Sequence, residues 1–123
     1  MPTNPRPVSL YEIVKRAVEN ADPDDADPRL GDLLAQFEDD DEPVTGVLDD
    51  LERLLADAVS FVDPGLDDPA VAVAAATVLY LAHRRDELHA PPETVLRLAS
   101  RAEWKGDPPE RVLDWLADRG VTV

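Results

Sequence analysis

The sequence contains no cysteine and only five glycines. A chain without cysteine forms no disulfide bond and no thiolate zinc site, which is typical of proteins from a reducing cytosol. Five scattered glycines also leave no glycine-rich loop that could hold a phosphate group. Functions that depend on disulfides, on thiolate metal centres or on such a loop are therefore excluded.

Long apolar runs are absent as well. The longest stretch without a charged residue, residues 69–82, has 14 residues, whereas a membrane-spanning helix needs about 20. Residues 1–8 are rich in proline and lack the apolar segment of a secretory signal. We therefore expect a soluble, cytoplasmic protein without a membrane partner.

Negative charge is what the sequence has in excess, with 27 acidic against 12 basic residues and a net charge of −15. Residues 1–68 carry 19 acids and 5 bases, whereas residues 69–123 carry 8 acids and 7 bases. Eighteen of the acids are aspartate and only two of the bases are lysine, a composition that resembles that of cytosolic proteins from extreme halophiles. At about 1 M salt the Debye length falls to about 3 Å, so such a surface no longer repels itself.

A disordered acidic chain is the alternative to a folded one. The 44% content of apolar residues and their helical spacing argue against disorder. We predict an all-α, compact single-domain bundle of about six helices. Residues 1–8 are expected to form a flexible Pro-rich N-terminus, and residues 9–123 a helical domain that is acidic over 9–68 and near-neutral over 69–123. The expected helices cover residues 10–20, 28–37, 44–62 and 70–86, and two more begin at the Pro-Pro-Glu sequences 91–93 and 108–110.

Capping residues mark most of these helix starts. Ser9 with Glu12, and Asp107 with Glu110, have the spacing of capping boxes. The Asp-Pro pairs at 27–28 and 68–69 place an aspartate at the cap and a proline at the first helical position. We interpret the repeated Pro-Pro-Glu as helix-start chemistry used twice rather than as a duplication.

The apolar pattern predicts where the core lies. The helix expected over 70–86 has no charge in its first thirteen residues, so it belongs in the middle of the fold. The best amphipathic stripe lies in the helix expected over 44–62. The tail 121–123 is the one strand-like segment. The residues that we expect to be buried in the core include Leu51, Leu55, Val78 and Leu79.

The aspartate-rich segment after the first helix has the residue types of a calcium loop but not its pattern. A calcium loop that begins at Asp22 needs glycine at its sixth position and glutamate at its twelfth, where this chain has Asp27 and Leu33. The acidic run 39–42 lacks the glycine too. We therefore interpret both segments as linkers whose carboxylates are solvated, and we predict no metal site there.

Other constellations that could support catalysis are weak. His83, Glu87 and His89 could ligate a transition metal, but a basic residue in a last helical turn is also favoured by the helix dipole. No serine lies in a Gly-x-Ser-x-Gly elbow. We predict no catalytic residue, no cofactor and a protein that is not an enzyme.

The basic and aromatic residues of the C-terminal half form the candidate binding surface. The bases either pair with carboxylates inside the fold or contact a partner, and an exposed tryptophan beside them would be an anchor for that partner. We predict docking to a protein partner or to a second copy of the chain through this half. The candidate residues for contact with a protein or nucleic acid are Arg84, Arg85, Arg97, Arg101, Trp104, Lys105, Arg111 and Trp115.

The alternative hypothesis is a DNA-binding transcriptional regulator. The last three expected helices, the turn at Gly106 and the closing segment 119–121 resemble a helix-turn-helix with a truncated wing. The last helix would then present Glu110, Arg111, Asp114 and Asp118 to the major groove. Three acids against one base make a poor surface for binding DNA, so we prefer protein docking.

Overall fold

The computed structural model of the protein describes residues 7–123, and over that range the chain is all-helical and contains no strand. The predicted six-helix bundle is confirmed. Within the described range, no helix is both long and apolar enough to cross a membrane. The elements are α1 (Leu10–Ala21), α2 (Pro28–Ala35), the 3-10 turns η1 (Val44–Gly46) and η2 (Leu48–Asp50), α3 (Leu51–Val62), α4 (Pro69–His83), the 3-10 turn η3 (Arg85–Glu87), α5 (Pro92–Trp104) and α6 (Glu110–Asp118).

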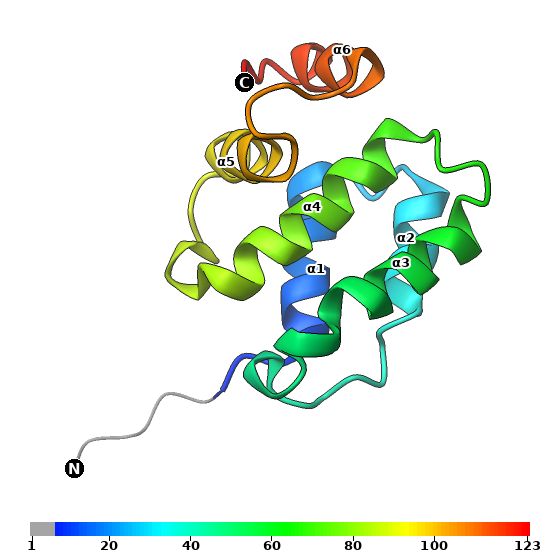
Figure 1. Ribbon diagram of the computed structural model, residues 1–123, viewed down its shortest axis with the longest axis vertical. Coiled ribbons are helices and arrows are strands. Elements are labelled where there is room, and N and C mark those ends of the chain that lie inside the picture. The colour runs from blue at the N-terminus through cyan, green and yellow to red at the C-terminus, as the bar shows by residue number, and fades with distance from the viewer. Residues whose placement is uncertain (1–6) are drawn as a thin grey trace.

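Helix α4 forms the centre of the fold, as its uncharged sequence predicts. It contacts each of the other five helices, and Figure 1 shows it running through the middle of the molecule. A helix surrounded by other helices has almost no solvent-exposed face and therefore needs no polar stripe. Leu51, Leu55 and Val78 are buried as predicted, whereas Leu79 is half-buried.

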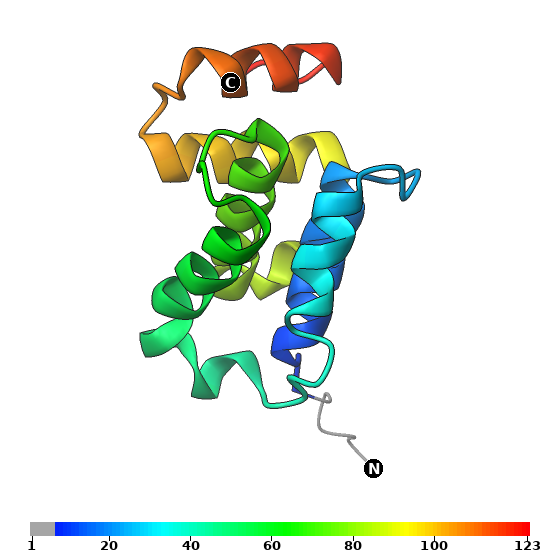
Figure 2. The same ribbon diagram turned by 90° about the vertical axis from the view of Figure 1, so that its right-hand side faces the viewer.

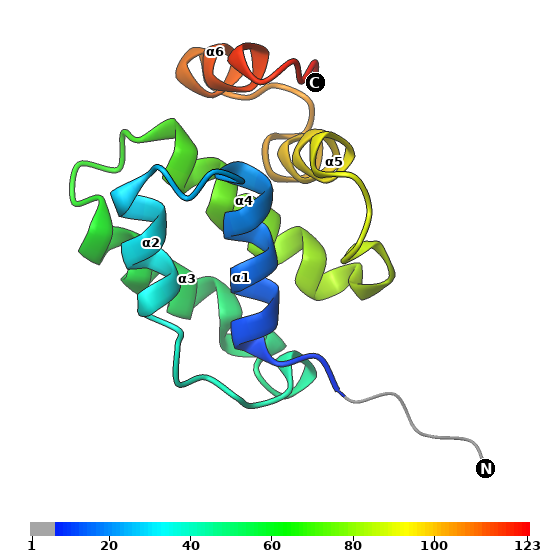
Figure 3. The ribbon, with the colours of Figure 1, turned by 180° about the vertical axis from the view of Figure 1, so that it is seen from behind.

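The other helices pack around α4 in pairs. Helix α1 packs against α2 and α4, which is visible from behind in Figure 3. Helix α3 packs against α2 and α4. Figure 2 shows that α5 and α6 run in opposite directions, one above the other, at one end of the bundle, and both contact α4. One continuous apolar core includes residues of all six helices.

The first helix begins where the sequence predicts. Ser9 Oγ accepts a hydrogen bond from the Glu12 amide at 3.1 Å, which is the expected cap. Of the N-terminus predicted to be flexible, residues 1–6 lie outside the described range. Val8 is part of the fold, because its carbonyl accepts a hydrogen bond from the Val44 amide at 2.9 Å and its side chain packs against the core.

The helix predicted over residues 44–62 begins only at Leu51. Residues 44–50 form η1 and η2 instead, separated at Val47, where φ is −124° and ψ is 10°. Gly46 disfavours an α-helix here, and the buried Val44 is held by its hydrogen bond to the carbonyl of Val8. The apolar spacing of this segment is therefore satisfied by a tertiary contact without a continuous α-helix.

Two further predictions about helix ends are wrong. Helix α4 ends at His83 rather than near Asp86, because Arg84 leaves the helical conformation, with φ at −127° and ψ at 62°. Helix α6 has no capping box at Asp107. Its cap is Pro109, which makes no side-chain hydrogen bond and holds the backbone extended at a ψ of 152°.

The end of α5 and the tail of the chain complete the core. Lys105 and Gly106 both have a positive φ, and the Gly106 amide donates to the Arg101 carbonyl at 3.1 Å. This is the left-handed helix end that Gly106 predicts. The tail is not a strand. Val121 is buried and its amide donates to the Leu116 carbonyl at 2.9 Å, so the tail folds back onto the end of α6.

Candidate functional site

The loops that join α1 to α2 and α3 to α4 share one sequence pattern. Both read Asp-Pro, then three residues, then Asp-Pro, at residues 22–28 and 63–69, which are 41 positions apart (63 − 22 = 41). In each loop the first aspartate ends the preceding helix and the second caps the following one. We name residues 20–27 the α1–α2 tip and residues 61–68 the α3–α4 tip.

The two tips also have the same backbone conformation. Asp22 has φ and ψ of −140° and 70°, and Asp63 has −141° and 72°. Three residues later, Asp25 has a φ of 52° and Leu66 has a φ of 54°. A left-handed residue at the same place in both loops shows that one turn design is used twice.

The hydrogen bonds of the tips match as well. The Asp22 carboxylate accepts from the amides of Ala26 and Asp27, each at 2.9 Å. The Asp63 carboxylate accepts from the amide of Asp68 at 3.0 Å. The prediction of a solvated linker carboxylate is therefore wrong for Asp22, since the Asp22 and Asp63 carboxylates replace the missing backbone partners of a tight turn.

The helices on either side of the tips correspond too. Each buried apolar residue of the first pair of helices has a buried or half-buried apolar counterpart 41 positions later in the second pair. The α1–α2 and α3–α4 hairpins are thus two copies of one helix-loop-helix unit. The matched buried pairs include Leu10 with Leu51, Val14 with Leu55, Ala17 with Ala58, Ala21 with Val62, Leu30 with Val71, Leu33 with Ala74, and Phe37 with Val78.

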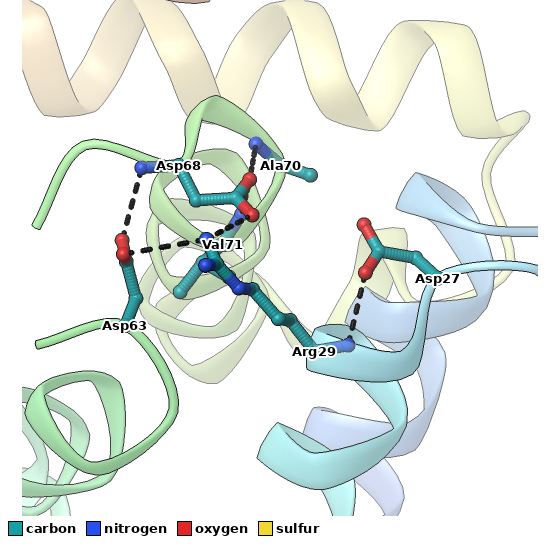
Figure 4. Close-up of polar contacts among 6 residues, drawn as sticks. All are labelled: Asp27, Arg29, Asp63, Asp68, Ala70 and Val71. Atoms are coloured by element: carbon teal, nitrogen blue, oxygen red, sulfur yellow. Dashed lines mark hydrogen bonds and ion pairs between the residues drawn. The ribbon is translucent and has the colours of Figure 1, made fainter.

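Arg29 ties the two copies together (Figure 4). Its Nη1 atom donates to Asp68 Oδ2 at 2.9 Å and lies 3.6 Å from Asp63 Oδ1. The hydrogen bond to Asp68, together with the charges of both aspartates, raises the pKa of Arg29. The counterpart of Arg29 in the second copy is Ala70, so this contact is made in one direction only.

The two tips differ in the exposure of the residue near the end of the helix that leads into each loop. Asn20 is 3% exposed, whereas its counterpart Phe61 is 71% exposed. A cavity of about 410 Å³ separates the α1–α2 tip from the start of α5 and the end of the chain, and its lining includes Asn20, Leu96 and Val121. No described segment covers the corresponding position of the α3–α4 tip. Phe61 and the 57% exposed Leu66 are therefore two large apolar side chains of this tip that lie in solvent.

The basic residues predicted to bind a partner separate into two groups. Arg84 pairs with Asp86 at 3.4 Å and with Glu87 at 2.9 Å, and Arg85 donates to the carbonyl of Ala82. These two bases stabilise the end of α4. The second group lies on α5 and α6, is exposed, and forms no ion pair within the described part of the chain. We name these four residues the α5–α6 bases, and they are Arg97, Arg101, Lys105 and Arg111.

Both tryptophans lie at the edge of the core. Trp104 and Trp115 are half-buried and pack against core residues. The guanidinium of Arg119 lies 3.5 Å from the centre of the Trp115 ring, which is a cation–π contact. Both side chains are therefore largely used by the fold, and the exposed large aromatic side chain of the described chain is Phe61 on α3.

Of the three residues that could have formed a metal centre, Glu87 has other partners. Glu87 accepts a hydrogen bond from the Tyr80 hydroxyl, and burial together with this bond raises the pKa of Tyr80 to about 12. Among residues 7–123, no three metal-ligating side chains lie close enough to share an ion. Comparison with protein-family models, curated proteins and solved structures gives no match to this chain. Any assignment of function therefore depends on the geometry and charge of the chain itself.

Proposed function

We propose that this acidic helical protein is not an enzyme and acts by docking to another protein molecule. The observation that carries the proposal is the exposure of Phe61 and Leu66 on one tip, when the large apolar residues of the first copy are buried or half-buried. Exposed apolar side chains with a polar rim are typical of protein interfaces. Aromatic residues are also enriched among those that contribute most of the binding energy.

The conformation of Leu66 supports a role outside the fold. A left-handed backbone costs a residue with a side chain about 1 to 2 kcal/mol, and aspartate tolerates it better than leucine. The first copy has Asp25 at this place, whereas the second copy has an exposed leucine. Leu66 gains little burial within the chain in return for this strain. Contact with a partner provides the missing burial.

A photo-crosslinking experiment tests the proposal. Benzoylphenylalanine replaces Phe61 in the full chain, expressed in its native cells, and a second variant carries it at Lys15, an exposed position on α1. We expect one discrete adduct from position 61 and none from position 15. Added wild-type protein should compete for the adduct, and added Phe61→Asp protein should not. An adduct pattern that is the same at both positions would contradict docking through the α3–α4 tip.

DNA binding is the second candidate, and the α5–α6 bases favour it because they have no carboxylate partner in the described part of the chain. Against it, Glu110, Asp114 and Asp118 are exposed on α6 beside a single base, Arg111. Phosphate contacts also lose affinity steeply as salt rises. We expect no appreciable binding to duplex DNA at moderate salt. Sequence-specific retention that is abolished by substitution of Arg97 and Arg111 would establish DNA binding instead.

A further inference from the structure

We infer that the partner of the α3–α4 tip is the α5–α6 end of a second copy of this chain, in a two-fold symmetric dimer. This inference deepens the proposed function and rests on it. Three observations carry it: α5 and the tail face the base of the other tip within the same chain, the α3–α4 tip exposes carboxylates while the α5–α6 end exposes bases, none of which forms an ion pair in the described part of the chain, and both surfaces lie toward one end of the molecule.

The first tip shows which kind of surface faces the base of a tip of this design. In the first copy, the base of the tip at Asn20 faces the start of α5 and the tail, through Pro92, Leu96, Arg119 and Val121. That surface combines apolar side chains with the Arg119 guanidinium and the carboxylates of Glu93 and Asp118. Phe61 occupies the place of Asn20 in the second copy, and a second molecule is a ready source of a further helical surface with apolar and charged groups.

The two surfaces differ in which exposed charges have no ion-pair partner, although α5 and α6 also expose the carboxylates of Glu103, Glu110 and Asp114. Asp57 lies one helical turn before Phe61, and Asp67 follows Leu66. Both carboxylates are exposed and neither forms an ion pair in the described part of the chain. The α5–α6 bases are exposed and lack carboxylate partners as well. Contact between an acidic apolar tip and these bases therefore pairs charges that are unpaired in the single chain.

The placement of the two surfaces allows the contact to be reciprocal. Figures 1 and 2 show the α3–α4 loop and α6 in the same half of the molecule, and in Figure 2 the turn between α5 and α6 lies above the loop. In a two-fold dimer the tip of each protomer meets the α5–α6 end of the other, so both contacts form and the assembly closes. Leu113, which is 41% exposed on α6, adds an apolar side chain to the second surface.

Sedimentation equilibrium tests for the dimer, with the full chain at rising concentration in potassium chloride that supports full helicity by circular dichroism. We expect the wild type to dimerise and Phe61→Asp to dimerise about tenfold or more weakly. Aromatic anchors in an interface contribute strongly to the binding energy. Leu66→Gly should weaken the dimer without loss of helix. Lys15→Glu, on α1, is the control and should dimerise like the wild type. A wild type that stays monomeric at every concentration would overturn the inference.

A mixing experiment tests the reciprocal geometry. One variant carries Asp57→Lys and Asp67→Lys, and the other carries Lys105→Glu and Arg111→Glu. Each reverses the charge of one surface, so each alone should dimerise about tenfold or more weakly than wild type. The mixture should form a heterodimer, because both tip-to-base contacts again pair opposite charges. A mixture that associates no more strongly than either variant alone would contradict this geometry.

The outcomes separate this inference from the proposed function. A monomeric wild type together with a discrete crosslink from position 61 to a chain of another mass would show docking to a different protein, and the second-copy inference would fail alone. A dimer that is unaffected by Phe61→Asp and by both charge reversals would place self-association elsewhere on the molecule. The absence of both a dimer and a discrete crosslink would contradict both proposals.

Discussion

Arg29 and Asp68 lie 39 positions apart in the sequence, and the Arg29 Nη1 atom donates to Asp68 Oδ2 at 2.9 Å. Asp68 at the same time caps α4, where its other carboxylate oxygen accepts from the amide of Ala70 at 2.9 Å. The side chain that starts the central helix is thus also the one that holds the first hairpin (Figure 4). A contact of this kind fixes how the two copies pack, although its exposure to solvent limits its strength.

Asp63 is the buried member of this cluster, and its loss should destabilise the fold. In Asp63→Ala the amide of Asp68 loses its acceptor and Arg29 loses a carboxylate. We expect a decrease of about 1 to 3 kcal/mol in the free energy of unfolding, measured by denaturant titration, because a partly buried donor is left without a partner. Asp24→Ala is a matched control, since it removes the same charge from an exposed position of the other tip. Equal effects in both variants would show that the free energy of unfolding changes because a negative charge is removed, and not because the hydrogen bonds of the turn are lost.

Leu66 allows stability to be separated from docking. Leu66→Gly removes the cost of a left-handed leucine and adds conformational freedom to the unfolded chain, and these effects nearly cancel. We expect a free energy of unfolding of the monomer within about 0.5 kcal/mol of wild type, together with a weaker dimer. Asp25→Gly makes the same backbone change in the other tip and should leave the dimer intact. A large loss of stability in Leu66→Gly would mean that this leucine supports the fold.

Local chemistry made much of the helical architecture predictable. Ser9, Asp27 and Asp68 cap the helices that their sequence positions predict, and the uncharged α4 lies at the centre of the bundle. These features depend on side chains within a few residues of the helix they affect. The segment 44–50 could not be predicted in the same way, because its conformation depends on a contact between Val44 and the distant Val8.

The candidate site is indicated in the sequence by a repeated loop pattern, whereas the distribution of charged residues does not reveal it. The pattern Asp-Pro-x-x-x-Asp-Pro occurs twice in the sequence, and comparison of residues 22–28 with residues 63–69 would have indicated two equivalent hairpins. The exposure of Phe61 could not be predicted even so. Its counterpart Asn20 is buried beside a cavity whose lining also includes residues of α5 and the tail, whereas Phe61 is exposed.

The core of the second hairpin gives a direct test of the packing. Leu55 is 3% exposed on α3 and belongs to the continuous core. Leu55→Ala should lower the free energy of unfolding by about 2 to 5 kcal/mol, because it removes buried apolar surface and leaves a cavity. The measurement is a thermal or denaturant unfolding curve at constant salt. An unchanged midpoint would show that α3 is not packed against the core.

Tyr80 gives a test of the polar cluster at the end of α4. Burial is the larger cause of its raised pKa and the hydrogen bond to Glu87 the next, so we expect ionisation at about pH 12 in an NMR titration of the ring carbon. Because the folded pKa lies above the unfolded value of about 10, this contribution to stability is complete below about pH 10 and is lost as the pH rises through the folded pKa. Glu87→Gln should lower the midpoint without returning it to the unfolded value. An identical midpoint in this variant would show that Glu87 does not act on Tyr80.

Salt is the variable on which the whole fold should depend. Residues 1–68 carry 19 acids against 5 bases, and in dilute buffer their repulsion acts over about 10 Å or more. We expect circular dichroism to show reduced helix in dilute buffer and recovery as potassium chloride approaches molar concentration, where the Debye length is about 3 Å. A variant in which Asp39, Asp40 and Asp41 are changed to Asn should need less salt, since it removes three adjacent charges from one exposed or half-exposed segment. Equal helicity and an equal thermal midpoint at low and high salt would contradict a protein adapted to concentrated salt, and would leave its acidic surface to be explained by the binding of a basic partner.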